Sequence, residues 1–158
     1  PLTLILLSIY WWDLNKAKTL FKADKEQFLT VGKIEQGMEI YRERFAISKY
    51  SESVDPQNKV TASKAAEGMI DIDGISASFV LYTQDNGVNL SARSDGTINV
   101  INIAKMLGGG GHFQSAGALI REIDENGFGN VVFDIKSAEK ILKDAIDSYI
   151  GETKEGKQ

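Results

Sequence analysis

Residues 75–94 read ISASFVLYTQDNGVNLSARS, and this stretch decides the fold because it encodes two strands joined by a turn. Apolar residues alternate with mostly polar ones in its first half, which predicts a strand with one buried face: Ile75, Ala77, Phe79 and Leu81. Asn86-Gly87 is typical of a tight hairpin, since both residues accept positive φ values. In the return strand one face is apolar, and the other presents Asn89, Ser91 and Arg93.

Helical and strand-like patterns alternate on both sides of this hairpin. In chain order we expect two short strands within 38–51, a helix over 58–70, a helix over 100–107 capped by Asn99, strands near 118–123 and 131–135, and a last helix that Ser137 caps and Gly151 ends. Hairpins mixed with crossover helices predict an α/β fold (α+β mixed), in which helices flank a mixed β-sheet.

The ends of the chain differ from its centre. Leu2–Trp12 is strongly apolar but too short to span a bilayer, and the chain begins at Pro1 rather than at methionine, so we expect a fragment of a longer protein. The predicted division is an apolar remnant or arm over 1–14, a linker helix over 15–37, a folded domain over 38–150, and a disordered tail over 151–158.

Composition restricts the function classes. The 158 residues carry a formal net charge of −4, whereas a domain that grips long nucleic acid through its phosphates is usually basic. The chain has no cysteine, which excludes disulfides and thiolate metal sites and fits a reducing cytosol. A few local cations could still bind a small anionic ligand.

Four consecutive glycines, Gly108 to Gly111, precede the chain's single histidine, His112. Such a run costs folding entropy, so it calls for a reason. One reason is an anion site, in which successive backbone N–H groups turn inward, a short helix opens after the glycines, and His112 donates at the rim. The alternative is a flexible loop with a surface histidine. No Gly-Lys-Ser or Gly-Lys-Thr follows, which excludes a phosphate loop of the nucleotide triphosphatase type.

The longer string GGGGHFQSAGA, residues 108–118, resembles the signature of the DHH-associated domain, the C-terminal partner in DHH phosphoesterases. The family pattern is a glycine run, a histidine, two variable residues and Ala-Ala-Gly, and here Ser115 replaces the first alanine. The resemblance extends from about residue 21 to residue 150. Residues 77–80 and 91–94 and the fourth glycine resemble most the cyclic-di-AMP phosphodiesterases of Gram-positive bacteria.

This resemblance implies a substrate-binding role for the domain over 38–150. Phosphate contacts are implied for Gly108, Gly109, Gly110, Gly111 and His112, a phosphate or base contact for Arg93, and additional hydrogen bonds for Ser91, Ser94 and Gln114. Arginine suits this role because its planar fork makes bidentate bonds to phosphate.

The family's reaction uses two divalent metals, with manganese the expected one, and the resemblance implies that the DHH half holds them. This sequence has one histidine and no Asp-His-His, so we expect no metal site, no catalytic residue and no hydrolysis by this chain alone. The expected partners are a cyclic dinucleotide or a short oligonucleotide and the DHH domain of the same chain.

Three interpretations stay open: a ligand-binding part of a cyclic-dinucleotide hydrolase, a nucleic-acid-binding module of a RecJ-like exonuclease or nanoribonuclease, and an interaction domain that binds no ligand. We expect a cytoplasmic location without membrane contact by this part, although membrane helices in the resembling proteins imply an anchored parent. Self-association into a homodimer also stays open.

Overall fold

The computed structural model describes residues 2–5, 24–52, 57–127 and 129–155. Its helices are α2 (Lys25–Gln36), α3 (Asn58–Ile70), α4 (Val100–Met106) and α5 (Ile135–Glu155). Its strands are β1 (Glu39–Tyr41), β2 (Phe45–Tyr50), β3 (Ala77–Gln84), β4 (Gly87–Ser94), β5 (Gly110–Gly111), β6 (Ser115–Leu119), β7 (Arg121–Ile123) and β8 (Gly129–Val131). Residues 2–5 are helical and exposed.

Six strands form one mixed sheet in the order β1-β2-β3-β4-β6-β5, and β7 pairs with β8 in a separate ribbon. Among the described strands only β2 and β3 run parallel, because the connection between them crosses over through α3. The predicted hairpin is present: β3 and β4 pair from Ala77↔Ser94 to Gln84↔Gly87, and Gly87 has a φ of 124°. The predicted α/β architecture, a mixed sheet flanked by helices, is confirmed.

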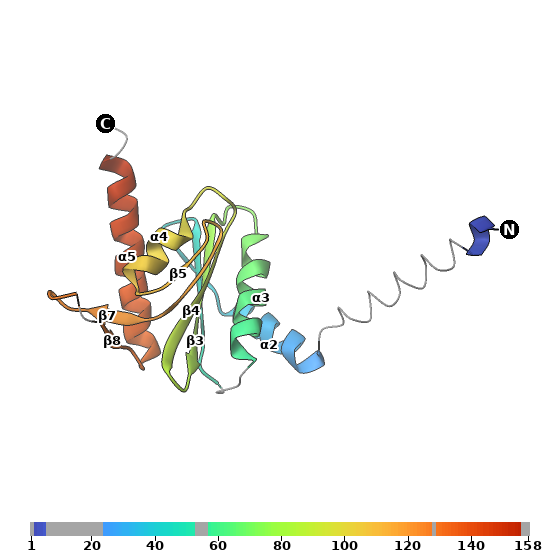
Figure 1. Ribbon diagram of the computed structural model, residues 1–158, viewed down its shortest axis with the longest axis horizontal. Helices are drawn as coiled ribbons and strands as arrows, with labels where there is room; N and C mark the ends of the chain where they lie inside the picture. The colour runs from blue at the N-terminus through green and yellow to red at the C-terminus, as the bar shows by residue number, and fades with distance from the viewer. Residues whose placement is uncertain (1, 6–23, 53–56, 128, 156–158) are drawn as a thin grey trace.

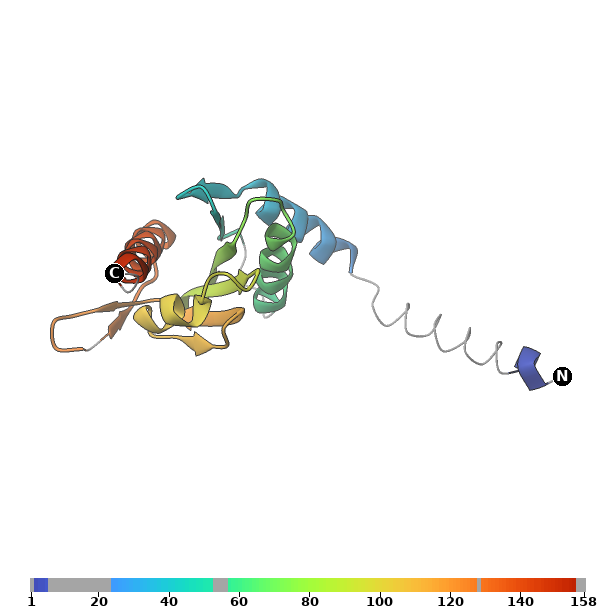
Figure 2. The ribbon, with the colours of Figure 1, turned by 90° about the horizontal axis from the view of Figure 1, so that it is seen from above.

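Helices cover both faces of this sheet (Figures 1 and 2). On one face, α2 and α3 pack on Ala46, Val80 and Tyr82. On the other face, α4 and α5 enclose the larger core, which contains Phe45 and Phe79. The helices α2 and α3 leave part of their face uncovered, and the site described below lies there.

The expectation of a single buried face on β3 is wrong. Ser78, Val80 and Tyr82 are buried together with Phe79 and Leu81, because β3 is a central strand with helices on both sides. Helix 58–70 is confirmed. So are the two strands within 38–51. The predicted linker helix is described from Lys25 to Gln36, while its earlier part and most of the predicted N-terminal arm lie outside the described residues.

Several predicted boundaries after β4 require correction. Strand 118–123 is two strands, β6 and β7, which separate at Ile120, and strand 131–135 ends at Val131. Asn99 stands at the N-cap position of α4 but makes no capping bond with its side chain. Its Oδ1 atom is buried without a hydrogen-bond partner among the described residues.

The last helix starts earlier and ends later than predicted. Asp134 caps α5, since its Oδ2 atom accepts from the Ser137 amide at 2.8 Å and from the Ser137 hydroxyl at 2.7 Å. The helix continues through Gly151 to Glu155, so Gly151 does not end it and the tail is helical as far as Glu155. Within the described part of the chain, no helix combines the length and apolar character needed to cross a membrane.

Candidate functional site

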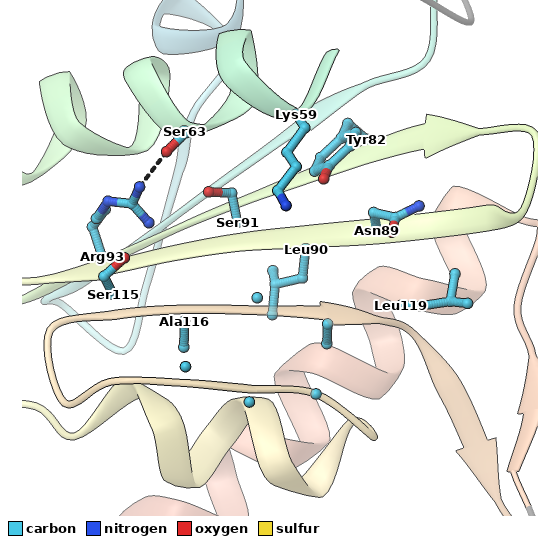
Figure 3. A pocket seen from close by; sticks show the side chains of 15 residues that line it. Lys59, Ser63, Tyr82, Asn89, Leu90, Ser91, Arg93, Ser115, Ala116 and Leu119 are labelled. Atoms are coloured by element: carbon cyan, nitrogen blue, oxygen red, sulfur yellow. Dashed lines mark hydrogen bonds between the residues drawn. The ribbon is translucent and has the colours of Figure 1, made fainter. Parts of the chain in front are cut away.

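A pocket of about 540 Å³ lies where the sheet extends beyond α3 (Figure 3). Its wall comes from α3, β3, β4, β5 and β6. The lining residues are Lys59, Ser63, Tyr82, Asn89, Leu90, Ser91, Arg93, Gly109, Gly110, Gly111, Ser115, Ala116, Gly117, Ala118 and Leu119. We call this the sheet-face pocket.

Strand register explains why the surface is hollow there. Ser91 pairs with Gly117, and Gly117 pairs with Gly110, so these three residues form one row across β4, β6 and β5. The same row continues to Val80, which α3 covers. Residues directly opposite one another share a face of the sheet. Beyond Val80 the row therefore consists of the small Ser91 side chain and two glycines, which leaves a depression in the floor of the pocket.

Larger polar side chains border this depression on both sides. On one side Arg93 pairs with Ser115, and on the other Asn89 pairs with Leu119 and with Tyr82. The predicted outward face of β4, with Asn89, Ser91 and Arg93, therefore faces a single pocket. Burial raises the pKa of Tyr82, so its hydroxyl stays protonated near neutral pH and can act as a donor.

Arg93 is held in place at one end of the sheet-face pocket. Its Nη2 atom donates to the Ser63 hydroxyl of α3, its Nη1 atom donates to the Ala92 carbonyl at 2.9 Å, and its Nε atom donates to Glu67 at 3.2 Å. The side chain is 18% exposed, whereas that of Glu67 is 61% exposed. A guanidinium fixed by three partners costs little additional entropy when it binds an anion.

Lys59 and Ser63 reach the sheet-face pocket from α3 (Figure 3). Neither residue was predicted as a site residue from the sequence, and neither were Tyr82, Asn89 and Ser115. For Asn89 the signal was available, since it lies two residues before Ser91 on the same strand face. Lys59 and Ser63 carry no local signal, because only the crossover between β2 and β3 brings α3 beside β4.

The glycine run is ordered, but it does not form the predicted nest of inward amides. The Gly108 amide donates to Lys105, the Gly109 amide to Ala104 and the His112 amide to Ser115, all at backbone carbonyls. Gly110 and Gly111 then pair with β6, and a tight turn follows in place of the predicted short helix. The anion-nest prediction is therefore wrong for these three amides.

The glycines instead permit close packing. A Cβ atom on Gly109 would lie 2.2 Å from the Gly117 carbonyl oxygen, and one on Gly111, where φ is 139°, would lie 2.5 Å from the Ser115 carbonyl oxygen. A Cβ atom on Gly110 would meet nothing within 4 Å. Gly109 and Gly111 thus bring β5 against β6, while Gly110 keeps the pocket floor open.

Four predicted site residues lie outside the lining of the sheet-face pocket. Gly108, His112 and Gln114 are exposed. Ser94 is buried, and its hydroxyl donates to the Ile98 carbonyl at 2.6 Å, which stabilises the loop before α4. The structure thus brings together Gly109, Gly110, Gly111, Ser91 and Arg93. In the described ranges, no group of three or more His, Asp or Glu side chains is arranged to hold a metal ion.

The solved structure of an exopolyphosphatase-related protein from Bacteroides fragilis shares this fold. The TM-score is 0.64 and the sequence identity 17%, and the match covers 81% of this chain and 36% of that one.

Sequence comparison gives nearer relatives. The cyclic-di-AMP phosphodiesterase PdeA of Listeria monocytogenes is 36% identical over 138 residues, which are 87% of this chain and 19% of that protein. The cyclic-di-AMP phosphodiesterase GdpP of Bacillus subtilis is 28% identical over 139 residues, covering 87% of this chain and 20% of that protein. The bifunctional oligoribonuclease and PAP phosphatase NrnA of Thermus thermophilus is 42% identical over 53 residues, or 34% of this chain and 16% of that protein.

The chain thus spans about a fifth of the length of PdeA and GdpP. The family model of the DHHA1 domain matches residues 46–151, which is more than half of the chain and includes the whole sheet-face pocket. The resemblance to the DHH-associated domain is confirmed: this chain belongs to the DHHA1 domain family.

Proposed function

We propose that this chain binds the substrate of a metal-dependent phosphodiesterase by holding a phosphate of a cyclic dinucleotide or a short oligonucleotide in the sheet-face pocket. The observation that carries the proposal is Arg93, a cation that is 18% exposed and is held at one end of the sheet-face pocket, next to the open floor of Ser91 and Gly117. Among the described residues of the lining, the charged ones are Lys59 and Arg93, and both are cations, so the pocket favours an anion even though the whole chain has a net charge of −4.

In this proposal the chain positions the ligand and another part of the parent protein performs the chemistry. Divalent metals, with manganese the expected ion, would be held outside this chain, where they would activate water for attack on phosphorus. Binding by Arg93 and by the hydroxyls of Ser63, Ser91 and Ser115 would fix the phosphodiester in one orientation, which removes entropy before the reaction. The purified chain should therefore bind without hydrolysis, and cleavage of cyclic-di-AMP by it would contradict this division.

The test is isothermal titration of the chain with cyclic-di-AMP. Arg93→Met should weaken binding by about 1.5–3 kcal/mol, the usual worth of hydrogen bonds to a charged group. Arg44→Met is the matched control, because Arg44 is exposed and lies outside the sheet-face pocket beside the Phe45 ring. Unfolding curves of both variants show whether loss of the Ser63 and Glu67 contacts alters the fold. Equal dissociation constants for wild type and Arg93→Met would contradict the proposal.

A second candidate is a module that binds the end of a short RNA, favoured by the similarity to the NrnA oligoribonuclease over 53 residues. A short oligoribonucleotide in the same titration separates the two, since the ligand that binds more tightly at equal salt identifies the substrate class. The same titration also tests the predicted phosphate contact of His112. His112 is exposed and outside the pocket, so His112→Ala should weaken binding only of ligands that extend beyond the pocket.

A further inference from the structure

We propose that the outer side of α2 is an interface with a second copy of this chain, in which the two α2 helices pack antiparallel about a two-fold axis level with Thr30. The surface consists of Phe28, Leu29 and Gly32, and we call it the α2 outer face. Phe28 is 70% exposed and Leu29 is 55% exposed. This inference goes beyond the proposed function and does not depend on the ligand of the sheet-face pocket.

Apolar residues lie on two sides of α2, although only one side packs on the rest of the domain. Ile34 is buried and Val31 is partly buried beside it, where α2 meets α3 and the sheet. Leu29 lies five residues before Ile34, which places the two side chains about 140° apart around the helix. Figures 1 and 2 show α2 at the outside of the molecule next to α3. A helix with apolar residues on a second, exposed side is typical of one that makes a second contact.

The α2 outer face is complementary to itself in shape. Phe28 and Gly32 are four residues apart, so they lie on one face of the helix and one turn from each other. A Cβ atom on Gly32 would meet nothing within 4 Å, so the surface is open there. When two copies pair antiparallel about the level of Thr30, Phe28 of each copy stands opposite Gly32 of the other. The ring can then pack on the glycine backbone in both copies at once, as a two-fold interface requires.

The charges beside the α2 outer face fit the same arrangement. Glu26 and Lys33 lie on one flank of this face, and both are exposed. A two-fold axis between antiparallel helices brings each flank against its own copy, so Glu26 of each chain stands next to Lys33 of the other. Lys33 already pairs with Glu52 at 3.4 Å, but that pair is exposed, and an ammonium has three donors. A parallel pair would place like charges side by side, so the charges favour the antiparallel one.

A second copy bound at the α2 outer face would leave the sheet-face pocket accessible. α2 packs at the β2 side of the sheet, where the Ser48 hydroxyl donates to the Ile34 carbonyl at 2.6 Å. The pocket lies over β4, β6 and β5, and α3 packs on the strands between these two places. α2 also precedes residues 46–151, which the DHHA1 family model matches. The proposed interface therefore belongs to the segment before the family domain.

Sedimentation equilibrium of the whole chain tests the proposal. α2 has 12 residues and is about 18 Å long, so the interface is smaller than that of a permanent dimer, and we expect a dissociation constant in the micromolar range. Phe28→Ala should raise this constant by roughly 100-fold, because each dimer loses two rings from the centre of its interface.

Gly32→Gln separates the interface from the fold. Glutamine has a higher helix propensity than glycine, so this variant should raise the Tm measured on dilute, monomeric protein. The same side chain fills the place of the second copy's Phe28 and should weaken the dimer by roughly tenfold or more. Gly151→Gln is the matched control, because Gly151 is equally open and lies in α5, so that variant should leave the dissociation constant unchanged.

Charge reversal tests the antiparallel register. Glu26→Lys alone and Lys33→Glu alone should each weaken the dimer by roughly tenfold, because like charges then meet twice across the axis. An equal mixture of the two variants should associate as tightly as wild type, since each lysine again meets a glutamate. A mixture as weak as its components would overturn the antiparallel arrangement. A wild-type chain that stays monomeric, or a dimer that Phe28→Ala and Gly32→Gln leave unchanged, would overturn the interface itself.

Discussion

Gly109 and Gly110 are neighbours in sequence, yet the structure predicts opposite results for the same substitution. A Cβ atom on Gly109 would lie 2.2 Å from the Gly117 carbonyl oxygen and 2.5 Å from the Ala118 Cβ atom. The space next to Gly110 is open to 4 Å. Gly109→Ala should therefore destabilise the protein, whereas Gly110→Ala should not.

The expected magnitudes follow from these contacts. Overpacking typically costs about 1–3 kcal/mol, and Gly109→Ala should reach the upper end because backbone atoms of β6 must move to relieve it. A loss of about 3 kcal/mol lowers the Tm of a domain of this size by roughly 6–12 °C. Gly110 has no left-handed φ, so Gly110→Ala restricts the unfolded chain without strain in the fold and should stabilise by about 0.4–1 kcal/mol.

Urea unfolding, monitored by circular dichroism, measures the free energy of unfolding of both variants, and the slope m should equal that of wild type. A larger side chain then separates stability from binding: Gly110→Leu should keep the unfolding midpoint but fill the pocket floor and abolish dinucleotide binding. Gly151→Leu adds the same side chain at another open position, in α5, and should leave binding unchanged. Equal destabilisation by Gly109→Ala and Gly110→Ala, or normal binding by Gly110→Leu, would refute this reasoning.

Two further predictions concern stability. Burial raises the pKa of Glu139, but hydrogen bonds from Lys143 and Lys49 outweigh it and leave that pKa below its ordinary value. The stabilisation by this carboxylate is therefore complete above the pKa of the unfolded state, about 4.3, and is lost as the pH falls through the lower pKa of the folded state. The difference in unfolding free energy between wild type and Glu139→Gln should therefore shrink when the pH is lowered below about 4.3. Asp134→Ala should lower Tm more than Ser137→Ala, because the Asp134 carboxylate accepts the hydrogen bond from the Ser137 amide that caps α5; equal Tm values would contradict this.

The hairpin and the outward face of β4 were predictable because their signals are local. A two-residue period assigns Asn89, Ser91 and Arg93 to one side of a strand wherever that strand lies. The turn at Gly87 is local as well. The part of the candidate site that β4 contributes, with Asn89, Ser91 and Arg93, could thus be predicted from twenty consecutive residues.

The rest of the candidate site depends on contacts between distant segments. Lys59 and Ser63 lie about thirty residues before β4 and reach it only because the parallel β2–β3 connection places α3 on this face. The same helix buries the second face of β3, which the alternation of that strand did not indicate. At the end of the chain, Gly151 lies in a helix held by the packing of Ile146 and Tyr149, and this packing overrides the glycine as a stop signal.

The glycine run shows how a motif can identify a family without forming the nest of amides that it predicted. An inward nest of amides and close packing of strands both require the absence of Cβ, so the sequence is the same for either. The two differ in the direction of each missing side chain and in the partners of each amide. At Gly109 and Gly111 the missing group would strike β6, while at Gly110 it would enter the space opposite Arg93 and Lys59. One glycine run therefore packs β5 against β6 and keeps the floor of the sheet-face pocket open at Gly110, and in the proposed function the charge that binds phosphate comes from β4 and α3 rather than from the glycine amides.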